Sequence, residues 1–401
     1  MNARALVSDP YAGYARLRAT PGLVQHPRER YFLVARYDDV REAAMRPEDF
    51  SSRIVEVLVR SIGLGTWFEA VMDRLGPVDV LAIVDAPSHL VHRKLATKHF
   101  GRDPVADAIA SASTRIDARL GRLVSDRGGD FAAAIAEPLP VELALTMLGF
   151  PLSDAARVKR LVDRAVSLLS GTLPRSGLAR TFATALELYG YSLVRIAWAR
   201  RRGGTGTPLG DAIVAAAADG TLGSREAASV VMQVLIAGAD STTSMLGSAV
   251  RMLADDPALA DRLRADPSLI SAFVEECLRL ESPFQGHFRV VRATTELAGT
   301  RLVPGDRLML LWASANRDPS AFESPDDVVL DRKNSRRPQL AFGQGIHLCL
   351  GAGLARAAGR TVIERFLRAT RSFELATDDL AHKPSEFVRT LTALPLRITP
   401  A

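Results

Sequence analysis

The stretch FGQGIHLCLG, from Phe342 to Gly351, places Cys349 among three glycines and a histidine. Glycine adopts backbone conformations that other residues avoid, so Gly343 and Gly345 allow a tight loop whose N–H groups approach the sulfur. A helix is expected just after Cys349, and the positive end of its dipole would lie beside a thiolate. Phe342 can cover the loop. The pattern favours a cysteine that binds a metal; a buried, inert cysteine in a glycine-rich turn is the simpler alternative.

The number of cysteines limits the kind of metal group that Cys349 could bind. The chain has two cysteines, Cys277 and Cys349, which are too few for a disulfide framework. Structural zinc and iron–sulfur clusters require several protein ligands, whereas a haem brings four nitrogens of its own and needs one thiolate. A haem iron is therefore the metal that a lone cysteine ligand fits best.

The spacing Phe342-x-x-Gly345-x-x-x-Cys349-x-Gly351 resembles the haem-binding signature of the cytochrome P450 family, and AFGQGIHLCLGAGLAR is close to its soluble bacterial form. The resemblance implies haem b (iron protoporphyrin IX), with Cys349 as its axial ligand and with Phe342, Gly343 and Gly351 beside it. It also implies a triangular, mainly α fold with small β-sheets, in which the haem lies between a long helix and the cysteine loop. The similarity extends from DPYAGYARLR to the closing strands, so we expect one domain over residues 1–401.

Composition excludes several other classes of protein. The 401 residues are 47% hydrophobic and 24% charged, which is ordinary for a globular protein. The net charge of +6 is mild and no run of Lys and Arg dominates, so nucleic acid is not an expected partner. No stretch reaches the roughly 18 to 20 apolar residues of a membrane span. The start, MNARALVSDP, lacks the apolar core of a secretion signal, so we expect a cytoplasmic protein.

Hydrophobic periodicity predicts a mostly helical chain with small groups of strands. The stretch from Arg225 to Asp256 is apolar almost all round, which is typical of a helix buried in a domain centre. Ser268 is the expected cap of a later helix. Helices are predicted near residues 9–20, 38–46, 89–100, 105–126, 153–170, 176–201, 225–256, 268–280 and 351–370. Strands are predicted within residues 30–37, 287–314, 373–376 and 394–400.

The segment AGADST, Ala237 to Thr242, interrupts the long apolar helix with small and polar residues. A hydroxyl that bonds back to the carbonyl four residues earlier can open a helix locally, and a simple polar kink is the plain explanation. The segment resembles the oxygen-activation motif of the P450 family. By that resemblance Ala237 lies against the haem, Asp240 relays protons and Ser241 hydrogen-bonds dioxygen. The family usually has threonine where Ser241 stands, so Thr242 could share its role.

Two further sets of residues match family positions. Glu276 and Arg279, three apart on a helix, resemble the family's Glu-x-x-Arg motif, with Arg332 as its structural third member; an exposed helix pair is the alternative. Charge-assisted donors for two haem carboxylates are also expected. These donors are His89, Arg93, Arg289 and His347. A further arginine common in the family is replaced by Val91, while His92 and His99 are expected on the surface.

Together these residues predict a monooxygenase that hydroxylates or epoxidises an apolar small molecule with O2. The chain has no glycine-rich nucleotide loop and no cluster cysteines, so a ferredoxin and a ferredoxin reductase are expected to supply electrons. His287 either bonds a polar group of the substrate or faces solvent. The expected substrate contacts are Trp67, Phe68, Ile236, Ala237, Phe284 and His287. The basic residues expected on the docking side are Arg93, Lys94, Lys98, Arg332, Lys333, Arg336, Arg337 and Arg356.

Three alternatives remain at this stage. A peroxygenase would use the same fold but would not need the acid and alcohol at Asp240 and Ser241. An oxidase that couples phenols on a carrier-bound peptide would share every motif. A haem-binding sensor without turnover would be expected to carry a signalling domain, and no such domain is visible in the sequence. These alternatives differ in chemistry, not in the expected haem ligand.

Overall fold

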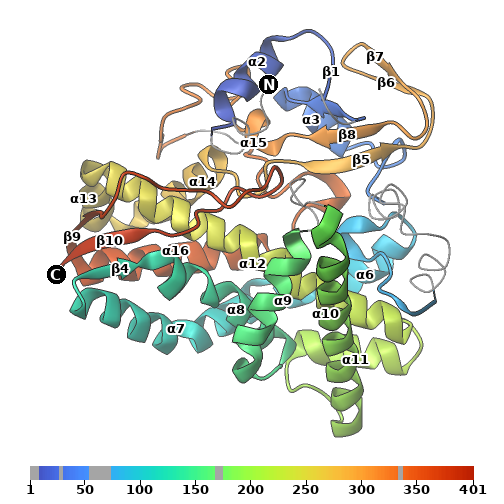
Figure 1. Ribbon diagram of the computed structural model, residues 1–401, viewed down its shortest axis with the longest axis horizontal. Coiled ribbons are helices and arrows are strands. Elements are labelled where there is room, and N and C mark those ends of the chain that lie inside the picture. Colours follow the sequence, from blue (N-terminus) through green and yellow to red (C-terminus); the bar gives the residue numbers. More distant parts are fainter. Residues whose placement is uncertain (1–8, 27–29, 54–73, 168–174, 333–336) are drawn as a thin grey trace.

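Helices make up most of the chain, and short strands form small sheets (Figure 1). The computed structural model describes residues 9–26, 30–53, 74–167, 175–332 and 337–401. The helices are α2 (Tyr11–Ala19), α3 (Tyr37–Ala44), α6 (Ser88–Thr97), α7 (Arg102–Ser125), α8 (Pro138–Leu148), α9 (Ala155–Ser167), α10 (Arg175–Arg202), α11 (Pro208–Ala218), α12 (Ser224–Asp255), α13 (Pro257–Ala265), α14 (Ile270–Leu280), α15 (Trp312–Ala315) and α16 (Ala352–Ala369). The strands are β1 (Val24–Gln25), β2 (Phe32–Val34), β3 (Phe50–Ser51), β4 (Gly128–Asp130), β5 (His287–Val291), β6 (Thr295–Leu297), β7 (Thr300–Leu302), β8 (Arg307–Leu310), β9 (Thr370–Leu375) and β10 (Pro395–Pro400).

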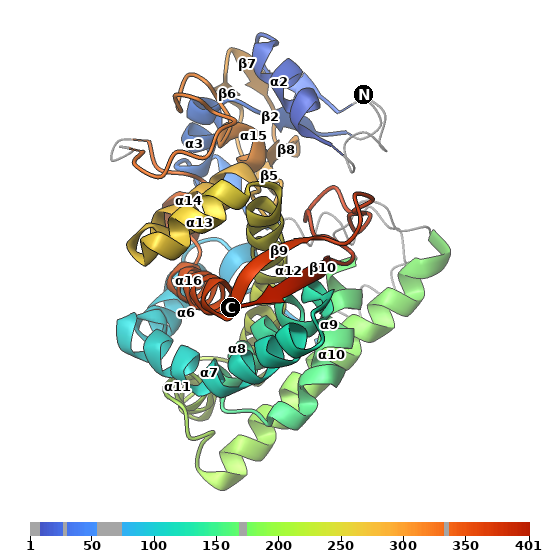
Figure 2. The same cartoon turned by 90° about the vertical axis from the view of Figure 1, so that its left-hand side faces the viewer.

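Helix α12 runs through the middle of the molecule and contacts α8, α10 and α16 (Figures 1 and 2). Its apolar residues point in all directions, and most of its length is buried, as expected for a central helix. The Glu226 carboxylate accepts a hydrogen bond from the N–H of Gly223 at 3.2 Å, which stabilises the first turn. The long apolar stretch of the sequence thus forms the central helix, and its bounds agree with the prediction to within one residue.

The strands gather on two sides of this helix. The larger sheet has the order β1-β2-β8-β5-β3, in which β2 and β8 are parallel and the other neighbours are antiparallel. It forms a strand-rich part together with α2, α3 and α15, whereas α7 to α11 lie on the opposite side of α12 (Figure 1). A second sheet, β4-β10-β9, lies beside α12 and α16 (Figure 2). The active-site candidates lie where the strand-rich part meets the helices.

Three predictions about elements were wrong or incomplete. Helices α8, α11 and α13 were not expected, because each opens with proline, which reads as a loop signal although it is tolerated in the first turn of a helix. Ser268 is not a cap: the Asp266 carboxylate accepts its N–H, and α14 begins two residues later. Helix α12 continues without interruption through Ala237–Thr242, so no open turn forms there. Within the described residues, no helix is both long and apolar enough to cross a bilayer.

Candidate active site

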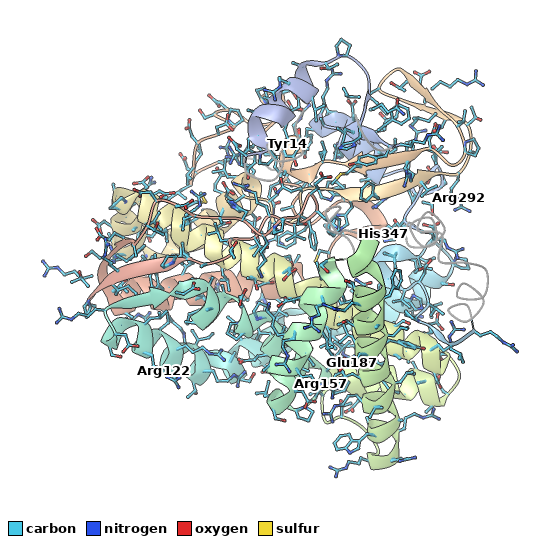
Figure 3. All side chains as sticks on the ribbon, viewed as in Figure 1. Tyr14, Arg122, Arg157, Glu187, Arg292 and His347 are labelled. Carbon is cyan, nitrogen blue, oxygen red and sulfur yellow. The ribbon has the colours of Figure 1, made fainter. Side chains whose placement is uncertain are left out.

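A cavity of about 1660 Å³ lies between α12 and the loop that carries Cys349. Its wall includes Ala237, Asp240 and Ser241 on α12, and Cys349 on the loop. Residues from α6 and β5 close further sides of it. His347 belongs to the same wall, and Figure 3 shows it at the junction of the strand-rich part and the helices. The fold therefore brings together segments that are separated by more than a hundred residues in the sequence.

Two glycines with positive φ shape the cysteine loop. Gly343 has φ of 72° and Gly345 has φ of 76°, a region that residues with a Cβ rarely adopt. A Cβ on Gly345 would lie 2.6 Å from the backbone oxygen of Ala44 at the end of α3, so the loop packs closely against that helix. The N–H of Cys349 donates to the oxygen of Phe342 at 2.9 Å and closes the loop. This turn points the sulfur into the cavity.

The surroundings of the Cys349 sulfur have two opposing effects on the pKa of its thiol. Its side chain is exposed by area, but the exposed part faces the cavity, and burial among protein atoms raises the pKa of the thiol. The N–H groups of Gly351 and Ala352 at the start of α16 and the guanidinium groups of Arg93 and Arg356 lower that pKa. Since burial dominates, a cation at the sulfur is required to hold the thiolate, as a metal does.

A set of buried donors faces the same cavity. The His89 and His347 rings lie 4.4 Å apart, and three of their nitrogens (Nδ1 of His89 and both of His347) are buried without a hydrogen-bond partner among the described residues. Burial, followed by the positive charge of Arg289, lowers the pKa of His347 to about 3. Burial also lowers the pKa of Arg289 to about 10. Neither Arg289 nor Arg93 has a carboxylate partner within the described ranges; Arg93 donates to the oxygen of Leu348 at 2.5 Å.

Buried donors without acceptors are rare, because each unmade hydrogen bond costs free energy. Two carboxylates in this corner of the cavity would satisfy His89, His347, Arg93 and Arg289 together. The donor set thus fits a ligand that carries two carboxylates and a metal, with the metal on the side of Cys349.

Comparison with known proteins agrees with this geometry. The family model "Cytochrome P450" matches residues 209–399. Cytochrome P450 144 of Mycobacterium tuberculosis is 35% identical over 394 residues, which cover 98% of this chain and 89% of that protein. This chain belongs to the cytochrome P450 family. The β-dihydromenaquinone-9 ω-hydroxylase of M. tuberculosis is 29% identical to this chain. The aligned residues cover 99% of this chain and 77% of the hydroxylase. The solved structure of cytochrome P450 CREJ in complex with (4-ethylphenyl) dihydrogen phosphate has a TM-score of 0.91 and 26% identity, and covers 98% of each chain.

The P450 is therefore a haem-thiolate monooxygenase that uses haem b, and its mainly α fold is the fold of the family. The residues present fit that cofactor. Cys349 is the sulfur that would bind the iron, and His89, Arg93, Arg289 and His347 are the donors that would bind the haem carboxylates. Ala237 and Gly238 on α12 offer a small-residue surface on the other side of the cavity, which suits a flat ring.

The polar residues of α12 in the P450 differ from one another in their bonding. Ser241 Oγ donates to the oxygen of Ala237 at 3.0 Å, so its hydroxyl is partly occupied by the helix. Thr242 is buried and lines the cavity. Thr243, which the sequence did not single out, donates to the oxygens of Ala136 and Ala239 and ties α12 to the segment before α8. Burial, reinforced by the negative charge of Asp163, raises the pKa of Asp240.

The contact expected of Glu276, Arg279 and Arg332 is present in the P450. The Glu276 carboxylate accepts two hydrogen bonds from Arg279 at 2.9 Å and two from Arg332 at 2.9 and 3.1 Å. The three side chains are almost fully buried, and both arginines also donate to backbone oxygens of the loop after Ala321. Arg332 was wrongly counted among the docking residues, because its side chain is 9% exposed and committed to Glu276.

The expected substrate contacts fall into two groups. Ile236, Phe284 and His287 line the cavity, as does Ala237. Trp67 and Phe68 lie outside the described residues. His287 does not face solvent: its ring is packed against Phe284 and Phe387. Phe387 was missed because it lies a hundred residues farther along the chain, in a loop without a motif.

Two histidines were wrongly expected on the surface of the P450. His92 is buried, and its Nε2 lies 2.6 Å from the Glu226 carboxylate on α12, while its Nδ1 lies 3.4 Å from the N–H of Leu81. His99 is also buried. Glu226 is 134 residues away in the sequence, so no local pattern could have indicated the pair.

Proposed function

We propose that this P450 hydroxylates or epoxidises an apolar small molecule with O2 and two electrons from a ferredoxin and ferredoxin reductase. The observation that carries the proposal is the cavity, which has a lone cysteine on one wall and an acid next to an alcohol on the facing helix. Haem b bound through a thiolate supplies oxygen activation and the transfer of one oxygen atom. A peroxygenase would have no use for a proton-carrying acid at this place, and this favours the monooxygenase.

The acid is Asp240. Burial holds its pKa above the ordinary value for aspartate, so it can keep and release a proton closer to neutral pH. Lys383, which donates to Glu137 at 3.0 Å, and Lys159, which donates to Asp163, are positive charges that act on Asp240 in the opposite direction. In this proposal Asp240 delivers protons into the cavity, while the Ser241 and Thr242 hydroxyls pass them on.

An apolar substrate is supported by the rest of the wall. Its side chains are mainly aliphatic and aromatic and come from several helices and loops. They include Leu143, Met147, Val234, Ile236, Phe284 and Phe387. The molecules named for two similar proteins, a dihydromenaquinone for the hydroxylase and an ethylphenyl phosphate in complex with CREJ, differ widely in size. For this chain we therefore propose an apolar molecule and no narrower class from the comparisons.

Docking of a ferredoxin is supported by charge on the cysteine side. Lys94 on α6 and Lys98, the residue after the end of α6, are exposed, and Arg93 and Arg356 lie near the sulfur. A positive surface would steer an acidic electron carrier. The proposal includes a cytoplasmic enzyme in which residues 1–401 act as one domain, because one sheet joins β1, β2 and β3 to β5 and β8, and another joins β4 to β9 and β10.

The test is the spectrum of the reduced protein with carbon monoxide, whose long-wavelength Soret band reports a thiolate ligand. We expect the wild type to show the band and Cys349→Ser to lose it. Cys277→Ser is the matched control, because Cys277 is buried beside α12 with its Sγ 3.7 Å from the oxygen of Met245, outside the cavity wall. A colourless wild type, or a band that survives in Cys349→Ser, would refute the assignment.

A further inference from the structure

His287 carries a polar group in the otherwise apolar part of the cavity wall, and its hydrogen-bonding character is fixed by a neighbour. The indole Nε1 of Trp312 lies 2.7 Å from His287 Nδ1. An indole N–H can only donate, so Nδ1 must be the acceptor and carry no proton. Burial, together with the positive charge of Arg289, lowers the pKa of His287 to about 3, so the ring is neutral at physiological pH. In a neutral ring whose Nδ1 accepts, Nε2 carries the hydrogen.

The ring has little freedom to turn away from this arrangement. The Phe284 and Phe387 rings lie 4.9 and 5.2 Å from it, and Trp312 is almost fully buried behind it. His287 starts β5, where it pairs with Leu310. Gly286 allows this approach, because a Cβ there would lie 2.6 Å from the oxygen of Leu310. Backbone and rings together hold the imidazole in place.

His287 Nε2 has no hydrogen-bond partner in the part of the chain that the structure describes, although the residue lines the cavity. A donor in an apolar wall gains most from an acceptor that arrives with a ligand, because an unmade hydrogen bond there costs free energy. A haem carboxylate is one conceivable acceptor, since Arg289 lies two residues along the same strand face. That carboxylate already has charged donors in Arg93 and Arg289, whereas His287 is neutral and lies among Phe284 and Phe387.

We propose that His287 selects substrates that carry an uncharged oxygen acceptor, such as a ketone, ether or hydroxyl oxygen, which accepts a hydrogen bond from Nε2–H. Trp312 is the positioning residue that keeps His287 in the donating tautomer. The inference rests on the proposed function and narrows its substrate class from apolar molecules to apolar molecules with one such oxygen. The loss of that oxygen from a ligand would leave the Nε2–H unsatisfied, so discrimination is expected even between ligands of equal shape.

The test measures binding of paired ligands to the haem-loaded protein through the shift of the haem band. Each pair is a rigid ketone and the alkene in which CH2 replaces the carbonyl oxygen, for example 2-adamantanone with 2-methyleneadamantane, in a panel of increasing cage size. We expect the wild type to bind the ketone about tenfold more tightly, a difference of about 1.4 kcal/mol. His287→Phe should bind both members equally, and His287→Gln, which keeps an N–H donor, should retain part of the preference.

The variant Trp312→Phe tests whether Trp312 fixes the tautomer of His287 or only contacts its ring. Without the indole donor the imidazole can also present an acceptor, so the ratio of ketone affinity to alkene affinity should fall. Equal binding of both members by the wild type, absence of any shift across the panel, or an unaltered preference in His287→Phe overturns the proposal. A changed haem affinity or reduction potential in His287→Phe without a changed preference would assign the residue to the haem carboxylates and also overturn it. If the thiolate band stays intact in these proteins while the ketone preference is absent, the substrate proposal fails and the assignment of Cys349 is unaffected.

Discussion

Burial of the Asp240 carboxyl group costs free energy. Its Oδ1 is buried and lacks a hydrogen-bond partner among the residues described. Burial raises its pKa, and a carboxyl with a raised pKa in a cavity wall is suited to carry protons. The nearest cationic influences, Lys383 and Lys159, are each bonded to another acid, so they do not neutralise Asp240 completely.

Replacing Asp240 tests this role. Asp240→Asn keeps the shape and removes the titratable carboxyl group, so we expect turnover of any ligand identified by the haem-band shift to fall about 10²-fold. The solvent deuterium isotope effect on turnover should rise in parallel. Asp255→Asn is the matched control on the same helix, because Asp255 is an exposed partner of Arg251 outside the cavity wall. A turnover equal to that of the control would remove Asp240 from proton delivery.

At the scale of residues, the sequence predicted what lies close together in the chain. The loop around Cys349 could be predicted because its glycines, the cysteine and the start of the next helix fall within ten residues of one another. The donating tautomer of His287 was not readable, because it depends on Trp312, which becomes a neighbour only when β5 pairs with β8. Burial of His92 likewise depends on Glu226 from α12.

The elements of the strand-rich part are held to the helices by buried ion pairs. Glu276 on α14 binds Arg279 and Arg332, and Arg332 belongs to the segment that leads to the cysteine loop. Burial alone would raise the pKa of Glu276, but the hydrogen bonds from both arginines and from the N–H of Val329 outweigh it and lower the pKa. A carboxylate with a lowered folded-state pKa stabilises the fold above its ordinary pKa, and this contribution is lost as the pH falls through the folded value.

We expect Glu276→Gln to reduce the free energy of unfolding by about 3 kcal/mol at pH 7, because two buried guanidinium groups lose their carboxylate. The difference from wild type should shrink as the pH falls below the ordinary glutamate value of 4.5, where the carboxyl is protonated in the unfolded chain, and on toward the lower folded-state value, where Glu276 itself is protonated. Denaturant unfolding followed by circular dichroism from pH 7 to pH 3 measures both effects. Glu275→Gln, next in sequence but in an exposed pair with Arg356, should change stability by less than about 1 kcal/mol. A difference that stayed constant with pH would contradict the ionic explanation.

At the scale of elements, periodicity predicted the helices with a single apolar stripe and the buried central helix. It failed where proline opens a helix, as in α8, because the same residue ends helices elsewhere. Periodicity also predicted the closing strands, β9 and β10, which pair antiparallel. The polar residues within α12 suggested an opening that the structure does not contain: Ser241 does bond back to the oxygen of Ala237, but the helix continues without a break.

At the scale of the whole molecule, charge is distributed unevenly around the cysteine. Lys94 on α6 and Lys98 just after it are exposed, and α6 also carries Arg93. Arg337 and Arg356, two of the other expected docking residues, are each paired with an acid, Asp38 and Glu275. Lys94 and Lys98 form no ion pair among the described residues, so they are better candidates for steering an acidic electron carrier.

We expect Lys94→Gln with Lys98→Gln to slow reduction by a ferredoxin about fivefold at low salt, because electrostatic steering is weakened. The difference should vanish as ionic strength rises and screening shortens the range of charge. Stopped-flow reduction at several salt concentrations measures it. Arg122→Gln with Arg371→Gln removes the same charge from α7 and β9, away from α6 (Figures 1 and 3), and should leave the rate unchanged. Equal slowing by both double variants would exclude a docking site on α6.

The contact between Gly345 and the oxygen of Ala44 has a consequence for biosynthesis. The loop around Cys349 packs through Gly345 against α3, which lies three hundred residues earlier in the chain. The neighbouring sheet joins β1, β2 and β3 to β5 and β8. The early strands therefore lack most of their sheet during synthesis until β8, which ends at Leu310, has emerged. A nascent chain stopped before residue 342 would lack Cys349 and is expected to be colourless.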